Sequence, residues 1–121
     1  MLSLPPSVKL FVSREPVDMR KAYDGLSGIV RDALEEDPLS GHLFIFFNRR
    51  MDRAKILWWD RSGFWLLCRR LEAGRFVLPK SDARDLEKKI RMSATDLALV
   101  LDGIDLSGAV RAKRYARAAT E

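Results

Sequence analysis

Residues 42–79 interleave arginines with large apolar side chains. Short blocks such as Phe-Ile-Phe-Phe and Ile-Leu-Trp-Trp alternate with breaks that carry arginine. A guanidinium group can form paired hydrogen bonds with a phosphate group, and an exposed aromatic ring can stack on a base. The pattern therefore indicates contact with nucleic acid, and a solvated rim around a sheet is the alternative interpretation of the same arginines.

The net charge of the chain comes from this one segment. Residues 42–79 contain eight basic and three acidic side chains, which accounts for the whole formal charge of +5 and leaves the remainder neutral. A basic excess confined to one segment predicts a surface patch. The candidate phosphate contacts form two rows, Arg49, Arg50, Arg53 and Lys55, followed by Arg69, Arg70 and Arg75.

Carboxylates are the other side chains that could do chemistry, because nucleases bind Mg²⁺ with Asp and Glu. Asp18, Asp52 and Asp60 each lie at an expected element boundary, where capping or a turn explains them better than metal binding does. One histidine and one cysteine, His42 and Cys68, form no zinc pattern, and no glycine-rich phosphate loop occurs. We therefore expect no catalytic residue, no metal and no cofactor.

Composition limits the class of protein. A chain of 121 residues, of which 47% are hydrophobic, predicts one domain with a real core. A single cysteine is typical of a reducing cytoplasm. The first residues lack the pattern of a signal peptide, and no apolar run has the roughly 18 residues of a membrane span. We expect a cytoplasmic protein without a membrane segment.

Hydrophobic periodicity predicts an α+β fold. Residues 8–12 resemble a short strand, and apolar positions at three- and four-residue steps predict a helix over 19–36 with Asp18 as its N-cap. Four further strands are expected at 43–47, 54–59, 64–69 and 75–78. The gaps between them are too short for parallel crossovers, so an antiparallel meander follows.

The last third of the chain is expected to be helical. Residues 81–91 are highly charged and predict a short exposed helix, and Ser93 caps a second helix with the apolar stripe Leu97, Val100 and Leu101. The expected architecture is a small, mainly antiparallel sheet with one packed helix and a helical C-terminal segment. Residues 1–110 form the single domain, and 111–121 form a basic flexible tail.

Both faces of the expected sheet are apolar. Residues 43–47 and 56–59 show no polar alternation, whereas a lone antiparallel sheet normally has one wet face. Phe44, Phe46, Trp58 and Phe64 are expected in the core beneath the helix. Phe47, Trp59 and Trp65 cannot all share that face, so they are predicted to form a partner interface. The terminal segments, another subunit or a ligand would cover it.

Three stretches of the sequence together resemble a known family. These are PVDMRKAYDGL (16–26), DPLSGHLFIFFNRRMDRAKILWWDRSGFWLLCRRLEAGRFVLP (37–79) and LALVLDGIDL (97–106). They are similar to the TnpB accessory proteins of insertion-sequence family 66, which are unrelated to the RNA-guided nucleases of the same name. The resemblance covers about residues 8–115. Phe47 departs from it, because an arginine or a small polar residue is common there, and the tail is longer.

The resemblance implies a role in bacterial DNA transposition beside a transposase and a second small accessory protein. It carries over no catalytic residues and does not define the molecular act. The arginine pattern predicts a non-enzymatic protein that contacts the DNA backbone through an arginine-rich sheet edge. A protein-interaction module that docks on the transposase without binding DNA is the first alternative, and a Mg²⁺-dependent nuclease subunit using the three aspartates is the second. A homo-oligomer is also possible in each case.

Overall fold

A computed structural model describes residues 5–79 and 87–103 of the chain. Its elements are β1 (Leu10–Ser13), α1 (Tyr23–Asp32), β2 (Leu43–Phe47), β3 (Arg53–Trp59), β4 (Phe64–Arg70), β5 (Lys89–Met92) and α2 (Ala94–Leu101). The strands form one sheet in the order β4-β3-β2-β1-β5. This arrangement confirms the predicted α+β class with a mainly antiparallel sheet.

The meander is continuous over β2, β3 and β4, as the short gaps predict. The exception is β1, which lies parallel to β2, with α1 as the crossover between them. On its other side β1 pairs antiparallel with β5. The predicted helix over 81–91 is therefore wrong at its C-terminal end, where the chain forms β5, and residues 80–86 lie outside the described part.

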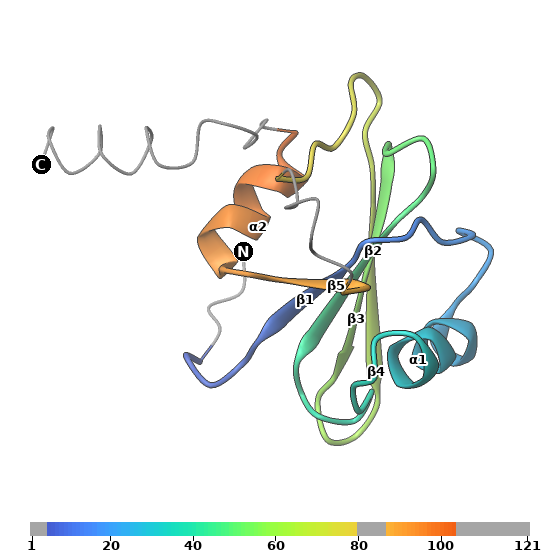
Figure 1. The fold of residues 1–121 in the computed structure, drawn as a ribbon, viewed down its shortest axis with the longest axis vertical. Coiled ribbons are helices and arrows are strands. Elements are labelled where there is room, and N and C mark those ends of the chain that lie inside the picture. The colour runs from blue at the N-terminus through green and yellow to red at the C-terminus, as the bar shows by residue number, and fades with distance from the viewer. Residues whose placement is uncertain (1–4, 80–86, 104–121) are drawn as a thin grey trace, which may run out of the picture.

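Two helices cover opposite faces of the sheet (Figure 1). One core cluster, on the α1 side, contains Phe11, Leu26, Val30, Leu34, Phe44, Phe46 and Leu57. The other, on the α2 side, includes Ile45, Phe47, Ala54, Ile56, Phe76, Leu97, Val100 and Leu101. Burying each of the larger side chains contributes roughly 1.5–3 kcal/mol. The chain's own α2 thus covers most of the second apolar face.

The helix α1 is shorter than predicted, and Asp18 does not cap it. Its N-cap is Ala22, without a side-chain hydrogen bond. Asp18 instead accepts the backbone N–H of Arg20 at 2.8 Å and holds the Arg20 guanidinium. Lys55 donates to the carbonyl groups of Met19 and Lys21, which keeps this segment out of the helix. At the other end, Glu35 has a φ of +55° and stops the helix.

The predicted C-terminal helix is confirmed. The Ser93 hydroxyl accepts the backbone N–H of Asp96 at 3.1 Å, which satisfies one of the unpaired donors at the start of α2. Gly103 has a φ of +80° directly after the helix, a conformation that glycine adopts without a steric cost. The predicted boundary at residue 110 and the predicted tail over 111–121 lie outside the described residues.

Residues 75–78 do not form the fourth meander strand. Phe76 is buried in the core on the α2 side, and its backbone N–H donates to the Met51 carbonyl at 2.6 Å. The apolar pattern of this segment therefore reflects burial of a loop rather than strand pairing.

No helix in the described ranges is long and apolar enough to cross a membrane.

Candidate nucleic-acid interface

Three segments meet at one end of the sheet and bring the predicted arginines together. They are the β2–β3 turn, the C-terminal end of β4 and the loop that follows β4 (Figure 1). The backbone N–H of Leu71 donates to Asp52 at 2.8 Å, and that of Phe76 donates to Met51 at 2.6 Å, so the loop is tied to the turn. We call residues 48–53 and 69–76 the basic end.

The β2–β3 turn is held by one asparagine. The Asn48 Oδ1 accepts the backbone N–H groups of Asp52 and Arg53, each at 3.0 Å, and its Nδ2 donates to the Asp52 carboxylate at 2.6 Å. The hydrogen bond from Asn48, aided by the charges of Arg50 and Arg53, lowers the pKa of Asp52. The turn thus presents Arg49 and Arg50 as exposed side chains on an organised backbone.

Like charges oppose each other in the neighbouring strands. Arg53 of β3 lies directly opposite Arg70 of β4, and Ala54 lies opposite Arg69. Opposed like charges in a cross-strand pair are destabilising. Arg70 is partly compensated by Glu72, whose carboxylate lies 3.0 Å away, although both side chains are mostly exposed. Such exposed ion pairs contribute little to stability.

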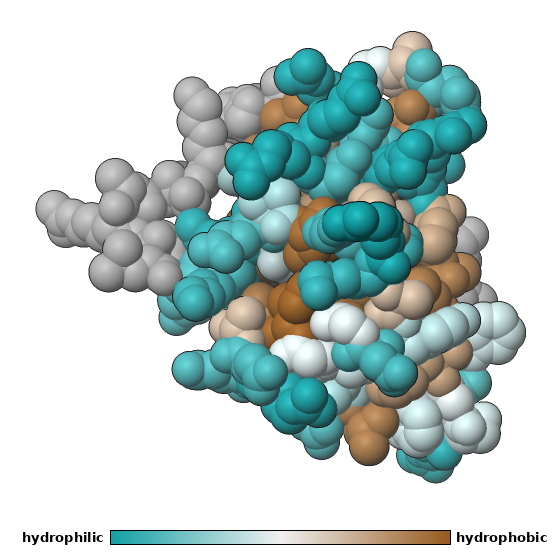
Figure 2. Space-filling view, turned by 90° about the vertical axis from the view of Figure 1, so that its right-hand side faces the viewer, coloured by the Kyte–Doolittle hydropathy of each residue, from teal (hydrophilic) through white to brown (hydrophobic). Residues whose placement is uncertain are grey.

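Most of these arginines form no salt bridge within the described ranges. Five of them form no salt bridge with another residue in the described ranges, namely Arg49, Arg50, Arg53, Arg69 and Arg75. A shallow hollow lies between the strand ends, lined by Met19, Arg53, Lys55, Arg69 and Arg70 among others. Figure 2 views the molecule from the α1 side and shows mainly hydrophilic side chains toward this end.

Lys55 differs from the exposed arginines, because its amine is engaged inside the protein. Its position in the sequence had predicted a phosphate contact. Its half-buried amine donates to the Met19 carbonyl at 2.7 Å and to the Lys21 carbonyl at 2.8 Å. Two of its three hydrogen-bond donors are thereby used inside the protein. Lys55 fastens the segment before α1 to β3 instead.

That fastened segment carries two cations that the sequence reasoning did not include. Arg20 and Lys21 are both exposed, and their neighbour Met19 lines the hollow of the basic end. The Arg20 guanidinium donates hydrogen bonds to the Asp18 carboxylate, the shortest at 2.6 Å, and the Arg20 backbone N–H donates another. These hydrogen bonds lower the pKa of Asp18 to about 2. The signal was present in the PVDMRK stretch, but it lies outside the segment that carries the excess charge.

The carboxylates do not converge. Asp52 precedes β3 and Asp60 follows it, and a seven-residue strand at roughly 3.3 Å per residue separates its ends by about 20 Å. Hydrogen bonds from the Ser62 backbone, the Trp65 indole and the Ser62 hydroxyl lower the pKa of Asp60 to about 2. In the part of the chain that the structure describes, no three potential metal ligands lie together.

The three aromatic residues predicted as an interface have different positions. Phe47 is only 1% exposed and its ring lies 5.2 Å from that of Phe76, so it belongs to the core. Trp59 is half-buried, with its ring 5.0 Å from that of Phe64. Trp65 is 54% exposed on the edge strand β4. Of the three, Trp65 alone presents a large free apolar surface.

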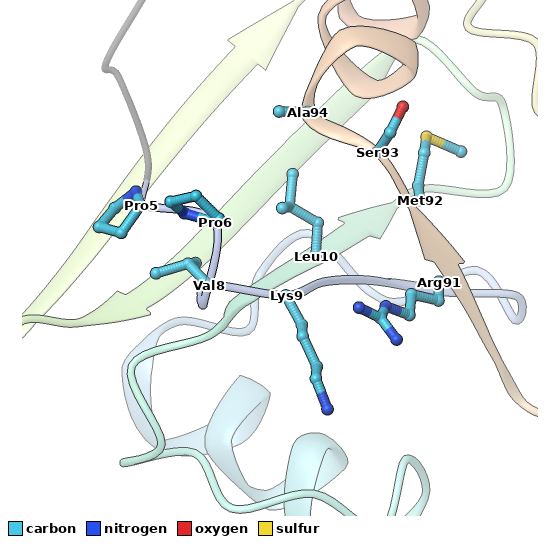
Figure 3. Close-up of a pocket in the computed structure, with 9 residues that line it drawn as sticks. All are labelled: Pro5, Pro6, Val8, Lys9, Leu10, Arg91, Met92, Ser93 and Ala94. Carbon is cyan, nitrogen blue, oxygen red and sulfur yellow. The ribbon is translucent and has the colours of Figure 1, made fainter.

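A second hollow lies at the far side of the sheet, between the start of the chain and the β5–α2 junction (Figure 3). Pro5, Pro6, Val8 and Met92 contribute apolar surface, and Lys9 and Arg91 contribute charge. The Ser93 hydroxyl, which also lines it, is already used to cap α2. Its described lining contains no carboxylate or thiol.

Fold and surface together define a small α+β protein with one basic end and, among its described residues, no gathered metal ligands. The chain belongs to the IS66 Orf2-like family, because the family model matches residues 8–111. This confirms the resemblance found in the sequence. Membership of this family indicates an accessory role in the transposition of insertion sequences.

Two relatives come from Sinorhizobium fredii (strain NBRC 101917 / NGR234), and both are described as uncharacterized proteins. The chain is 32% identical to y4jC over 105 residues, covering 87% of this chain and 86% of the relative. It is 33% identical to y4hO over 105 residues, covering 87% of this chain and 88% of the relative. No solved structure matches the chain.

Proposed function

We propose that the protein is a non-catalytic accessory factor of insertion-sequence transposition that contacts the DNA backbone through its basic end. The observation that supports this proposal is the convergence of six arginines from three segments at one end of the sheet, five of which form no salt bridge among the described residues. The contacts are Arg49, Arg50, Arg53, Arg69 and Arg75, with Arg70 shared between DNA and Glu72.

Rigidity of the basic end favours phosphate binding. Asn48 organises the turn, and strand pairing fixes the backbone of Arg53, Arg69 and Arg70. Side chains on a fixed backbone lose less conformational freedom when they bind. A phosphate between Arg53 and Arg70 would also relieve the repulsion between two opposed positive charges. Contacts of this type position a protein on DNA without reading its sequence.

The test is a salt titration of binding to a labelled duplex that carries an end of the element, beside an unrelated duplex of equal length. If about four phosphates are neutralised, log K should fall against log salt with a slope near −3.6, from roughly −0.9 for each contact. Little preference between the duplexes is expected. The double variant Arg49→Ala/Arg50→Ala should flatten the slope by about 1 to 2.

The matched control is Arg31→Ala/Arg91→Ala, which removes the same charge from α1 and β5. Its slope should stay close to that of the parent, because neither position belongs to the basic end. Equal loss of binding in both double variants would show a general charge effect. A folded Arg49→Ala/Arg50→Ala variant that keeps the parent's affinity and slope would remove these two arginines from the site.

The alternative function is docking on the transposase without DNA contact, and the exposed apolar surface of β4 is the observation that favours it. The transposase and the second accessory protein of the element are the expected protein partners in either case, and the bacterial cytoplasm is the expected place of action. Tight binding to purified transposase, together with no salt-dependent binding to either duplex, would establish docking instead.

A further inference from the structure

The edge strand β4 exposes an apolar strip. It pairs on one side with β3 and has no strand on its other side within the described chain. Trp65 is 54% exposed and Leu67 is 46% exposed, and strand alternation places both on the same face. An exposed, long and hydrophobic edge strand is a template for pairing with another chain.

The opposite edge of the sheet is protected, unlike β4. The strand β5 has four residues, against seven in β4, and it carries Lys89 and Arg91. It also passes directly into α2 after Ser93. Short length and charged side chains are the means by which edge strands avoid pairing. This contrast makes β4 the edge strand that is available for pairing with another chain.

We propose that β4 pairs with β4 of a second copy, antiparallel, about a two-fold axis at Leu67. The strand divides into an apolar half, Phe64–Leu67, and a half that ends in two arginines. Antiparallel pairing about Leu67 places Arg69 opposite Trp65 of the second copy, and Arg70 opposite Phe64 of the second copy. Each arginine then lies beside an aromatic ring, an arrangement with favourable cation–π geometry.

Other registers lack this complementarity. A parallel, in-register pair would place Arg69 and Arg70 beside the same residues of the second copy, and opposed like charges are destabilising. A two-fold axis near Arg69 or Arg70 would do the same. The axis at Leu67 is self-complementary, which is the requirement for a closed dimer. It also joins the exposed Trp65 and Leu67 surfaces of both copies on one face.

The two basic ends point away from each other in this dimer. Six residue steps separate the two copies of Arg70 across the axis, which corresponds to about 20 Å at roughly 3.3 Å per residue. The turns that carry Arg49 and Arg50 lie farther out along the sheet. The dimer therefore leaves Arg49 and Arg50 accessible to DNA, whereas Arg69 and Arg70 lie at the interface between the copies. The proposed dimer does not depend on whether DNA is bound.

The first test is the mass of the full chain in solution, measured by light scattering over a range of concentrations. The parent should have twice the 13.9 kDa of one chain. Leu67→Lys should be a monomer, because it places two ammonium groups together at the axis. The matched control is Leu39→Lys, at a residue that is 51% exposed outside the sheet, and it should remain a dimer.

The second test fixes the register by cross-linking. In a Cys68→Ser background, Leu67→Cys should form an intermolecular disulfide under mild oxidation, because directly opposite Cα atoms are about 4.5–5.5 Å apart. The native Cys68 lies diagonal to its copy across the axis, at roughly 7–8 Å, and should cross-link far less.

A monomeric parent at all concentrations would overturn the proposal, and so would a dimer that survives Leu67→Lys. Preferential cross-linking through Cys68 would overturn the axis at Leu67. Binding of the monomeric parent to a strand-forming peptide through β4 would assign the edge to a different partner. Circular dichroism of each variant shows that it is folded, and the cross-link tests the interface even if Leu67→Lys fails to fold.

Discussion

Arg53 and Arg70 occupy directly opposite positions in the antiparallel pair of β3 and β4. This pairing destabilises the folded protein, because two positively charged side chains extend from Cβ atoms that are only about 5 Å apart. Of the two, Arg70 alone forms a salt bridge among the described residues, with the carboxylate of Glu72. The relationship links stability to the proposed function, because a bound phosphate would satisfy both guanidinium groups.

Replacing Arg53 with threonine should therefore separate stability from DNA binding. Threonine suits a strand and removes the repulsion, so the free energy of unfolding should rise by about 0.2–1 kcal/mol. Affinity for a DNA duplex should fall. Urea unfolding and fluorescence anisotropy measure the two effects. A variant that is less stable than the parent would show that Arg53 supports the fold.

Lys55→Met should destabilise the protein and leave the electrostatics of DNA binding unchanged. The substitution removes the amine that donates to Met19 and Lys21, and hydrogen bonds to a charged group contribute roughly 1.5–3 kcal/mol. The salt slope should match that of the parent when binding is measured below the denaturation temperature. Unchanged stability with a flatter slope would restore Lys55 to the phosphate contacts.

Asn48→Ala should weaken DNA binding without removing any positive charge. The alanine leaves the backbone N–H groups of Asp52 and Arg53 without their acceptor, which costs about 1–3 kcal/mol and loosens the turn. Arg49 and Arg50 are then no longer held on a fixed backbone. Anisotropy titrations of the folded variant check this, and parental affinity would show that organisation of the turn is unimportant.

Stability should decrease in acid because of two aspartates. The pKa values of Asp18 and Asp60 are about 2 in the fold, against an ordinary 3.8, because hydrogen bonds stabilise each charged form. Their contribution is complete above the unfolded pKa and is lost as pH falls from about 4 to about 2. Asp60→Asn should show a smaller decrease in urea midpoint over that range. An unchanged pH profile would contradict the role of Asp60.

Local pattern was sufficient for the meander and for α2. The expected bounds of β2, β3 and β4 agree with those in the structure to within one residue. Their apolar blocks are bounded by turns, which need no distant partner. The capping of α2 by Ser93 was also visible, since the hydroxyl and the N–H that it accepts are three residues apart. The basic excess of residues 42–79 is likewise a property of the sequence.

Tertiary contacts overrode the local pattern elsewhere. Lys89–Met92 lies in a charged stretch with a helical pattern, yet pairing with β1 makes it a strand. Lys55 resembles its arginine neighbours in the sequence, but the carbonyl groups that it binds belong to residues more than 30 positions away. Phe47 looked free because the segments that bury it, around Phe76 and in α2, come much later in the chain.

The basic end likewise depends partly on local sequence and partly on tertiary contacts. Residue type and charge were readable along the chain, but the alignment of Arg53 with Arg70 depends on the register between two strands. The position of Arg75 beside the β2–β3 turn depends on the hydrogen bond from Phe76 to Met51. Charge is a property of each residue type. The convergence of these charges depends on the backbone hydrogen bonds that join β3 to β4 and the following loop to the β2–β3 turn.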